Sequence, residues 1–152
     1  MRIALFEPEI AGNVGAVLRL AACMGVGVDL IEPMGFAWDD RRVRRTAMDY
    51  IDHVEIARHV DFDAFKSTIG SRRLVLFTTK ARQSAYEFDF AADDVLLFGK
   101  ESAGVPLAVA DACDARVRIP MQAAVRSLNL ATTTALALGE ALRKTGTLPF
   151  AS

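Results

Sequence analysis

The sequence predicts an α/β fold with a mainly parallel sheet that is flanked by helices. Short apolar runs alternate along the chain with stretches whose apolar residues recur at helical spacing, and this alternation is typical of strands joined by crossover helices. Two of the runs are continuous, which indicates strands that are covered on both faces. The length suits a single core, so we expect one domain over residues 1–152.

The first half of the chain alternates regularly between the two kinds of element. Strands are predicted at residues 3–6, 26–31 and 54–56. Helices are predicted at residues 13–24, from Asp39 or Asp40 onward, and at residues 61–69. Asn13 is a suitable N-cap for the first helix, and Gly25 can end it.

The second half begins with the two continuous apolar runs. Strands are predicted there at residues 73–77, 94–98 and 117–119. A long helix rich in Ala, Leu and Thr is predicted at residues 128–143, and Lys144 suits the negative end of its dipole.

Composition excludes several classes of protein. Hydrophobic residues make up 52% and charged residues 24%, as in ordinary globular proteins, and no apolar stretch is long enough to cross a bilayer. The amino terminus has no signal-peptide pattern, so we expect a cytoplasmic protein without membrane contact. Cys23 and Cys113 lack a CxxC partner and are expected to be buried and reduced. His53 and His59 have no partners at metal-ligand spacing, so no metal site is expected.

Three loops follow predicted strands and are the expected place for a ligand, because open α/β sheets bind ligands beyond the carboxyl ends of their strands. They span residues 7–15, 99–106 and 120–129. Neither a G-x-G-x-x-G fingerprint nor a complete P-loop is present, which argues against ordinary dinucleotide and nucleoside-triphosphate sites.

Each of these loops carries a distinctive pattern. Residues 7–15 read E-P-E-I-A-G-N-V-G, and with Arg19 they contain N-x-G-x-x-x-R. Residues 98–106 contain F-G-x-E followed by G-V-P, while I-P-M at residues 119–121 is followed by R-S-L-N-L. In this order and spacing the patterns resemble the three motifs of SPOUT-class RNA methyltransferases, and the resemblance runs almost from end to end.

Within that class, residues 31–40 (I-E-P-M-G-F-A-W-D-D) look closest to the tRNA (cytidine/uridine-34) 2′-O-methyltransferases. The resemblance implies transfer of a methyl group from S-adenosylmethionine to the ribose of the wobble nucleotide, a cytidine or cmnm5-uridine, in leucine tRNAs. It also implies a homodimer, a deep trefoil knot at the carboxyl end and no metal. Two alternatives stay open: action on another tRNA position or on rRNA, and a catalytically silent RNA-binding module.

The cofactor would need an apolar slot edged by backbone donors and acceptors, which glycine-rich loops can supply. By position in the motifs, six residues are expected to line it: Phe77, Gly99, Gly104, Ile119, Ser127 and Leu128. The alternative is that they are turn glycines and strand-end hydrophobic residues with no ligand.

Four polar residues of the motifs are candidates for the catalytic machinery: Arg19, Asn13, Glu101 and Asn129. Similar enzymes assign the arginine to the 2′-hydroxyl. The very high pKa of an arginine opposes a role as general base, so we expect Arg19 to position the substrate or contact a phosphate. Asn13, Glu101 and Asn129 could orient RNA or hold the loops.

A cluster of arginines is the expected RNA contact: Arg41, Arg42, Arg44 and Arg45. A net charge of −1 gives no general attraction to nucleic acid, so a local patch is required. The alternative is a solvated helix face that is balanced by the nearby Asp39, Asp40 and Asp49.

Overall fold

Six parallel strands form one sheet in the computed structural model, which describes residues 1–150. The sheet order is β3-β2-β1-β5-β4-β6, and every neighbouring pair is parallel. The strands are β1 (Arg2–Phe6), β2 (Gly27–Ile31), β3 (Ile56–His59), β4 (Leu74–Phe77), β5 (Val95–Phe98) and β6 (Ala115–Val117). The predicted α/β class with a mainly parallel sheet is therefore confirmed.

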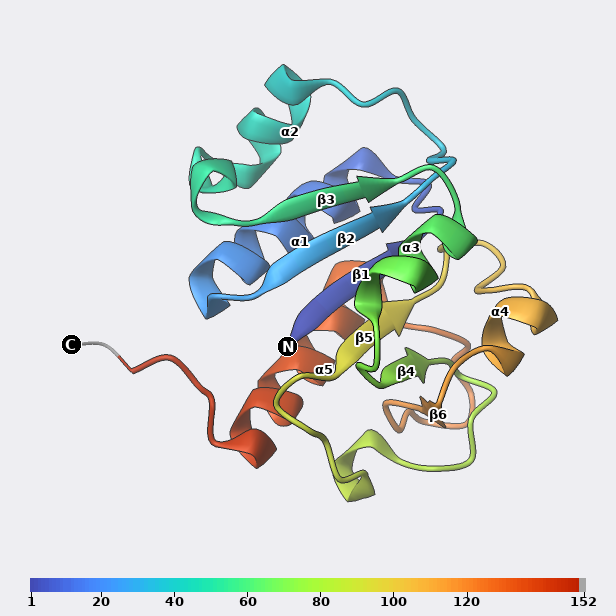
Figure 1. Cartoon of the computed structure of the whole chain (residues 1–152). Coiled ribbons are helices and arrows are strands. Elements are labelled where there is room, and N and C mark those ends of the chain that lie inside the picture. The colour runs from blue at the N-terminus through green and yellow to red at the C-terminus, as the bar shows by residue number, and fades with distance from the viewer. Residues whose placement is uncertain (151–152) are drawn as a thin grey trace.

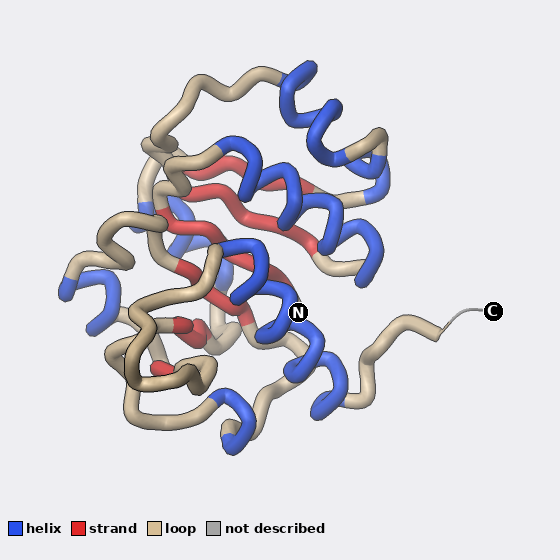
Figure 2. Tube along the Cα trace, turned by 180° about the vertical axis from the view of Figure 1, so that it is seen from behind, coloured by secondary structure: helices blue, strands red, loops and turns tan. Residues whose placement is uncertain are grey.

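The helices cover both faces of this sheet. They are α1 (Ala11–Met24), α2 (Asp40–Ala47), α3 (Phe62–Ile69), α4 (Leu107–Asp111) and α5 (Leu130–Thr145), with short 3-10 turns η1 (Tyr50–His53) and η2 (Ala85–Glu87). α3 lies on the face turned toward the viewer in Figure 1. α1 and α5 lie side by side on the opposite face, and α2 packs on α1 (Figure 2).

Two apolar cores explain why the strands read as continuous hydrophobic runs. In β1, Ile3 and Leu5 belong to the core under α1 and α5, while Ala4 and Phe6 belong to the core under α3. Every residue of β4 and β5 is buried. Because both faces are covered, polar alternation is absent from these strands.

The predicted first helix has the wrong start. α1 begins at Ala11 after Ile10, which makes no side-chain capping bond, so the prediction of Asn13 as N-cap is incorrect. Asn13 lies in the first turn of the helix and is buried, and its side-chain amide bonds to other loops. Gly25 does end the helix, in the left-handed region at φ 68°.

β1, β2, β4 and β5 each begin one residue away from the prediction, and β3 and β6 differ by more. β3 begins at Ile56 because Val54 is still the C-cap of η1, with its N–H bonded to the carbonyl of Ile51. β6 ends at Val117, where its carbonyl accepts a bond from Thr78 just beyond the end of β4. The chain then leaves the sheet, so residues 118 and 119 belong to the site loops rather than to the strand.

The cysteines and histidines were predicted only in part. Both cysteines are free, but Cys23 is exposed, contrary to the expectation of burial; Cys113 is half-buried, and burial raises the pKa of its thiol to about 11. His59 is buried, with Nε2 2.8 Å from Oδ1 of Asp29. Within residues 1–150, no three His, Cys, Asp or Glu side chains form a group that could hold a metal ion. No helix in that range has the length and apolarity to span a membrane.

Candidate active site

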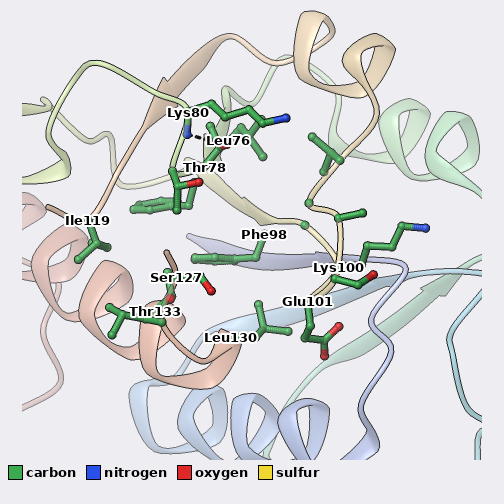
Figure 3. Close-up of a pocket in the computed structure, with 18 of the residues that line it drawn as sticks. Leu76, Thr78, Lys80, Phe98, Lys100, Glu101, Ile119, Ser127, Leu130 and Thr133 are labelled. Carbon is green, nitrogen blue, oxygen red and sulfur yellow. Dashed lines mark hydrogen bonds between the residues drawn. The ribbon is translucent and has the colours of Figure 1, made fainter. Parts of the chain in front are cut away.

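A cavity of ≈ 830 Å³ lies beyond the carboxyl ends of β4, β5 and β6. The strand order reverses between β1 and β5, and the predicted ligand loops follow β1, β5 and β6. Figure 3 shows Ile119, Ser127 and Thr133 on one side of the cavity and Lys100 and Glu101 on the other. The three sequence motifs therefore meet around one space.

Glu101 joins the second motif to the first. Its carboxylate accepts bonds from the backbone N–H of Glu9 at 2.8 Å and of Ile10 at 3.2 Å, and from the side-chain amide of Asn13 at 3.2 Å. These donors precede or begin α1, which has no capping side chain of its own. Glu101 therefore fixes the segment that leads into α1, and its negative charge suits the positive end of the helix.

Asn13 joins the first motif to the third. Its Oδ1 accepts a bond at 3.0 Å from Nδ2 of Asn129, whose own Oδ1 caps α5 by accepting from the N–H groups of Ala131 and Thr132. One chain of bonds therefore runs through Glu101, Asn13 and Asn129. Both carboxylate oxygens of Glu101 already accept from protein donors, so the geometry supports a positioning role for Glu101 rather than proton transfer.

A second set of contacts ties the same loops together. Glu9 accepts bonds from the N–H of Ser102 at 2.9 Å and from its hydroxyl at 2.6 Å, and these bonds lower the pKa of the Glu9 carboxyl. Lys100 pairs with Glu7 at 3.0 Å. Hydrogen bonds to a carboxylate and one ion pair thus connect the first two motifs to each other. These contacts fix one wall of the cavity before any ligand binds.

Replacing Glu101 with alanine should loosen this wall. We expect the free energy of unfolding to fall by about 1–3 kcal/mol because the amide of the buried Asn13 and two N–H groups lose their acceptor. Methyl transfer should fall about tenfold through misplacement of the loops. Denaturant unfolding and single-turnover transfer measure the two effects, and Glu87→Ala, at an exposed position of η2, is the matched control.

The variant Glu101→Gln separates positioning from proton transfer. A glutamine keeps the side-chain shape and one oxygen acceptor but turns the other oxygen into a donor, so it should retain more stability and activity than alanine. If it keeps the stability of the wild type but loses transfer and the pH dependence of the rate, the positioning role is wrong.

Two glycines shape the floor of the cavity. Gly99 and Gly104 face each other across a short bridge, in which Lys100 and Gly104 exchange backbone bonds of 3.1 and 2.9 Å. A Cβ on Gly99 would lie 2.5 Å from the carbonyl carbon of Gly104, and Gly104 itself has φ 67°. The bridge therefore requires glycine at both positions, the first for space and the second for its backbone conformation.

The cavity fits a ligand that combines an aromatic ring, a sugar and a polar tail. Phe77 and Ile119 form buried apolar walls, and Phe77 stacks on Phe98 with ring centroids 5.0 Å apart. Hydroxyls of Thr78 and Ser127 stand at the edge (Figure 3). All six residues predicted from the motifs for the cofactor line the cavity: Phe77, Gly99, Gly104, Ile119, Ser127 and Leu128.

Some lining residues were not predicted from the sequence. Thr78, Thr79 and Lys80 line the cavity directly after β4, and Thr133 reaches it from the first turn of α5. The loop after residues 73–77 followed a predicted strand just as the three selected loops did. The position of that loop was the available signal, although it contains no pattern that distinguishes it.

Arg19 does not lie among the described residues that line the cavity. It follows Asn13 by six residues, which is roughly 9 Å farther along α1. Its side chain is exposed, donates to Sδ of Met48 at 2.9 Å and lies 5.4 Å from the ring centroid of Tyr50. Within one chain, the structure therefore separates Arg19 from Asn13, Glu101 and Asn129.

The predicted arginine cluster lies on α2 and is also separate from the cavity. α2 packs on α1, far from β4 and β6 in Figure 1. Arg41, Arg42, Arg44 and Arg45 are all exposed. Arg44 pairs with Asp52 at 3.0 Å, with both side chains largely in solvent. The cluster is therefore available for contact, but only at a distance from the cavity of its own chain.

The arrangement of fold and motifs agrees with comparisons with known proteins. The model of the SpoU rRNA Methylase family matches residues 1–139. The chain belongs to this family, which confirms the predicted class of methyltransferase. A tRNA (cytidine(34)-2′-O)-methyltransferase from Beijerinckia indica is 52% identical over 148 residues, which cover 96% of this chain and 92% of the relative.

Solved structures give the same result for the fold. One that concerns 2′-OH methylation of C/U34 on tRNA superposes with a TM-score of 0.89 at 38% identity, and 94% of each chain is covered. An AdoMet-bound rRNA methyltransferase from Sinorhizobium meliloti superposes with a TM-score of 0.85 at 28% identity, over 93% of this chain and 55% of the other. The α/β fold described above is thus that of SPOUT methyltransferases.

Proposed function

We propose that this protein transfers a methyl group from S-adenosylmethionine to the ribose 2′-hydroxyl of nucleotide 34, a cytidine or cmnm5-uridine, in leucine tRNAs. The observation that carries the proposal is the 52% identity to a tRNA (cytidine(34)-2′-O)-methyltransferase over nearly the full length of both chains. The predicted cofactor is confirmed by the family, and the cavity has the apolar walls, hydroxyls and paired glycines that S-adenosylmethionine needs.

When bound, the cofactor supplies a methyl group on a positively charged sulfur that a hydroxyl oxygen can attack in line. The role of the chain is then mainly to align the two reactants, which can account for much of the rate. Gly99, Gly104 and Ile119 shape the cofactor pocket, while the chain of bonds through Glu101, Asn13 and Asn129 holds its loops. Arg19 positions the ribose by contact with oxygen atoms, because a guanidinium offers hydrogen-bond donors and no acceptor.

A homodimer would bring Arg19 to a cavity. The sides of α1 and α5 that face away from the sheet expose small or apolar side chains, including Ala16, Ala135 and Leu136. We propose that a second copy packs on this face. Arg19 belongs to the exposed side of α1, so each copy can offer its arginine to the cavity of its partner. The exposed arginines of α2 are proposed to hold the phosphates of the tRNA.

Three further properties are part of the proposal. The chain acts as one catalytic domain, as the near-complete coverage of the Beijerinckia indica relative supports. It works in the cytoplasm, where tRNA is available. The carboxyl-terminal segment forms a trefoil knot; in support, Arg118 pairs through its backbone with residues 83–85 before the chain turns back toward α5.

The test is transfer of labelled methyl groups from S-adenosylmethionine to total tRNA that lacks the wobble 2′-O-methyl group. The product is digested with nuclease and mapped by mass spectrometry. We expect the label on the ribose of nucleotide 34 in leucine tRNAs. A label at another tRNA position, or on rRNA supplied in parallel, would contradict the proposed acceptor and leave the methyltransferase class in place.

A further inference from the structure

A second, smaller hollow opens beside the cofactor cavity. It has a volume of ≈ 310 Å³ and is lined by Thr79, Arg118, Ile119, Met121, Gln122, Ala123, Val125 and Arg126. Thr79, Ile119 and Met121 also line the large cavity, so the two spaces share a wall. Among the described residues, neither Arg118 nor Arg126 lines the large cavity. The small hollow thus has two cationic side chains of its own.

These two arginines are exposed and carry uncompensated charge. Across residues 1–150, no Asp or Glu oxygen lies within 4.0 Å of either guanidinium. Arg116, two residues before Arg118, differs because it pairs with Asp111 at 2.6 Å. Two free guanidinium groups on the walls of one hollow create a positive potential that favours an anion.

The backbone on both sides of the hollow is ordered by hydrogen bonds. The N–H of Arg118 donates to Gln83 at 3.0 Å, and its carbonyl accepts from Ala85 at 2.9 Å. Arg126 follows a turn that is closed by a 3.1 Å bond from Val125 to Gln122. The next residue, Ser127, already lines the cofactor cavity. The backbone that carries Arg118 is therefore already fixed before an anion binds.

We propose that Arg118 and Arg126 bind a backbone phosphate of the RNA, adjacent to the nucleotide whose ribose enters the large cavity. This inference rests on the proposed function. Arginines that stay exposed are suited to a polyanion lying across the surface, whereas small-molecule sites bury most of their ligand. The shared wall places the phosphate directly beside the reacting ribose, a position that the arginines of α2 do not occupy in the same chain.

The test compares the double variant R118Q/R126Q with the wild type in binding of an unmodified leucine tRNA transcript over a series of salt concentrations. We expect the Kd at moderate salt to rise about tenfold. The slope of log K against log salt should become shallower by roughly 0.7 for each single-strand phosphate contact that is lost. The Kd for S-adenosylmethionine, measured by calorimetry, should change less than about twofold.

Two further variants keep the outcome decisive. K66Q/R72Q removes the same charge from α3 and the segment before β4, and should leave both the Kd and the salt slope near those of the wild type. R118K/R126K keeps the charge and should retain most of the slope. Thermal unfolding shows whether each variant is folded.

Unchanged tRNA binding by R118Q/R126Q would overturn the phosphate site. Loss of S-adenosylmethionine binding instead would also overturn it and assign the arginines to the carboxylate of the cofactor. The proposed function fails separately, if wild-type protein binds this tRNA but leaves nucleotide 34 unmethylated. In that case the change in binding and salt slope still decides the phosphate site.

Discussion

Replacing Arg19 with alanine is expected to lower methyl transfer at least about 100-fold, since a fixed donor at the reacting oxygen is worth this much or more. Binding of S-adenosylmethionine should be unchanged, because Arg19 lies outside the proposed cofactor cavity of its own chain and is proposed to contact the ribose of the RNA rather than the cofactor. Single-turnover transfer to leucine tRNA and calorimetry with the cofactor measure the two quantities. Loss of cofactor binding in Arg19→Ala would contradict the positioning role.

The contacts of Arg19 within its own chain provide the control. The guanidinium lies over Tyr50 and donates a hydrogen bond to Met48. If Arg19 served only to hold these neighbours, removing one of them would lower transfer about as much as removing Arg19. Tyr50→Leu should therefore reduce transfer only a few-fold. Arg19→Lys keeps the charge but not the planar fork, and we expect it to recover part of the lost rate.

Replacing Gly99 with alanine is expected to cost the protein most of its cofactor affinity. The new Cβ would stand 2.5 Å from the carbonyl carbon of Gly104, so the bridge between the two backbone segments must open. Overpacking of this kind costs about 1–3 kcal/mol, which corresponds to a rise in the Kd for S-adenosylmethionine of roughly 5- to 150-fold. Calorimetry measures the change.

A second glycine shows whether the effect comes from this contact or from glycine replacement in general. Gly12, in the first turn of α1, lies outside the left-handed region, and a Cβ added to it would project into open space. Gly12→Ala should leave cofactor binding intact and stabilise the helix slightly. Equal affinity of Gly99→Ala and the wild type would show that the Gly99–Gly104 bridge does not shape the cofactor site.

The variants Arg19→Ala and Gly99→Ala can be combined to test the proposed dimer. If Arg19 serves the cavity of the partner, mixed dimers of Arg19→Ala and Gly99→Ala subunits contain one site with both features intact. Random mixing at equal amounts would then restore about one quarter of the wild-type sites. No recovery after confirmed subunit exchange would place Arg19 in the cavity of its own chain.

The sequence was sufficient for the fold class and for six of the residues that line the cavity. The continuous apolar run within the strand predicted at residues 73–77 indicated a doubly covered strand, and burial of every residue of β4 and β5 bears this out. Motif residues such as Gly99 and Ile119 were predicted to lie together because parallel strands end at one edge of the sheet. The pattern of apolar residues predicts the strands, and the parallel direction of the strands predicts that their carboxyl-terminal loops lie together.

Only the tertiary structure decided how the polar motif residues are used. Asn13 has the side chain of an N-cap, yet Glu101, 88 residues later in the chain, accepts the bonds at the start of α1 and leaves Asn13 to bond Asn129. The separation of Arg19 from the cavity likewise depends on the side of α1 that packs on the sheet. Local sequence cannot specify such contacts, because a hydrogen bond between distant residues depends on the packing of whole elements.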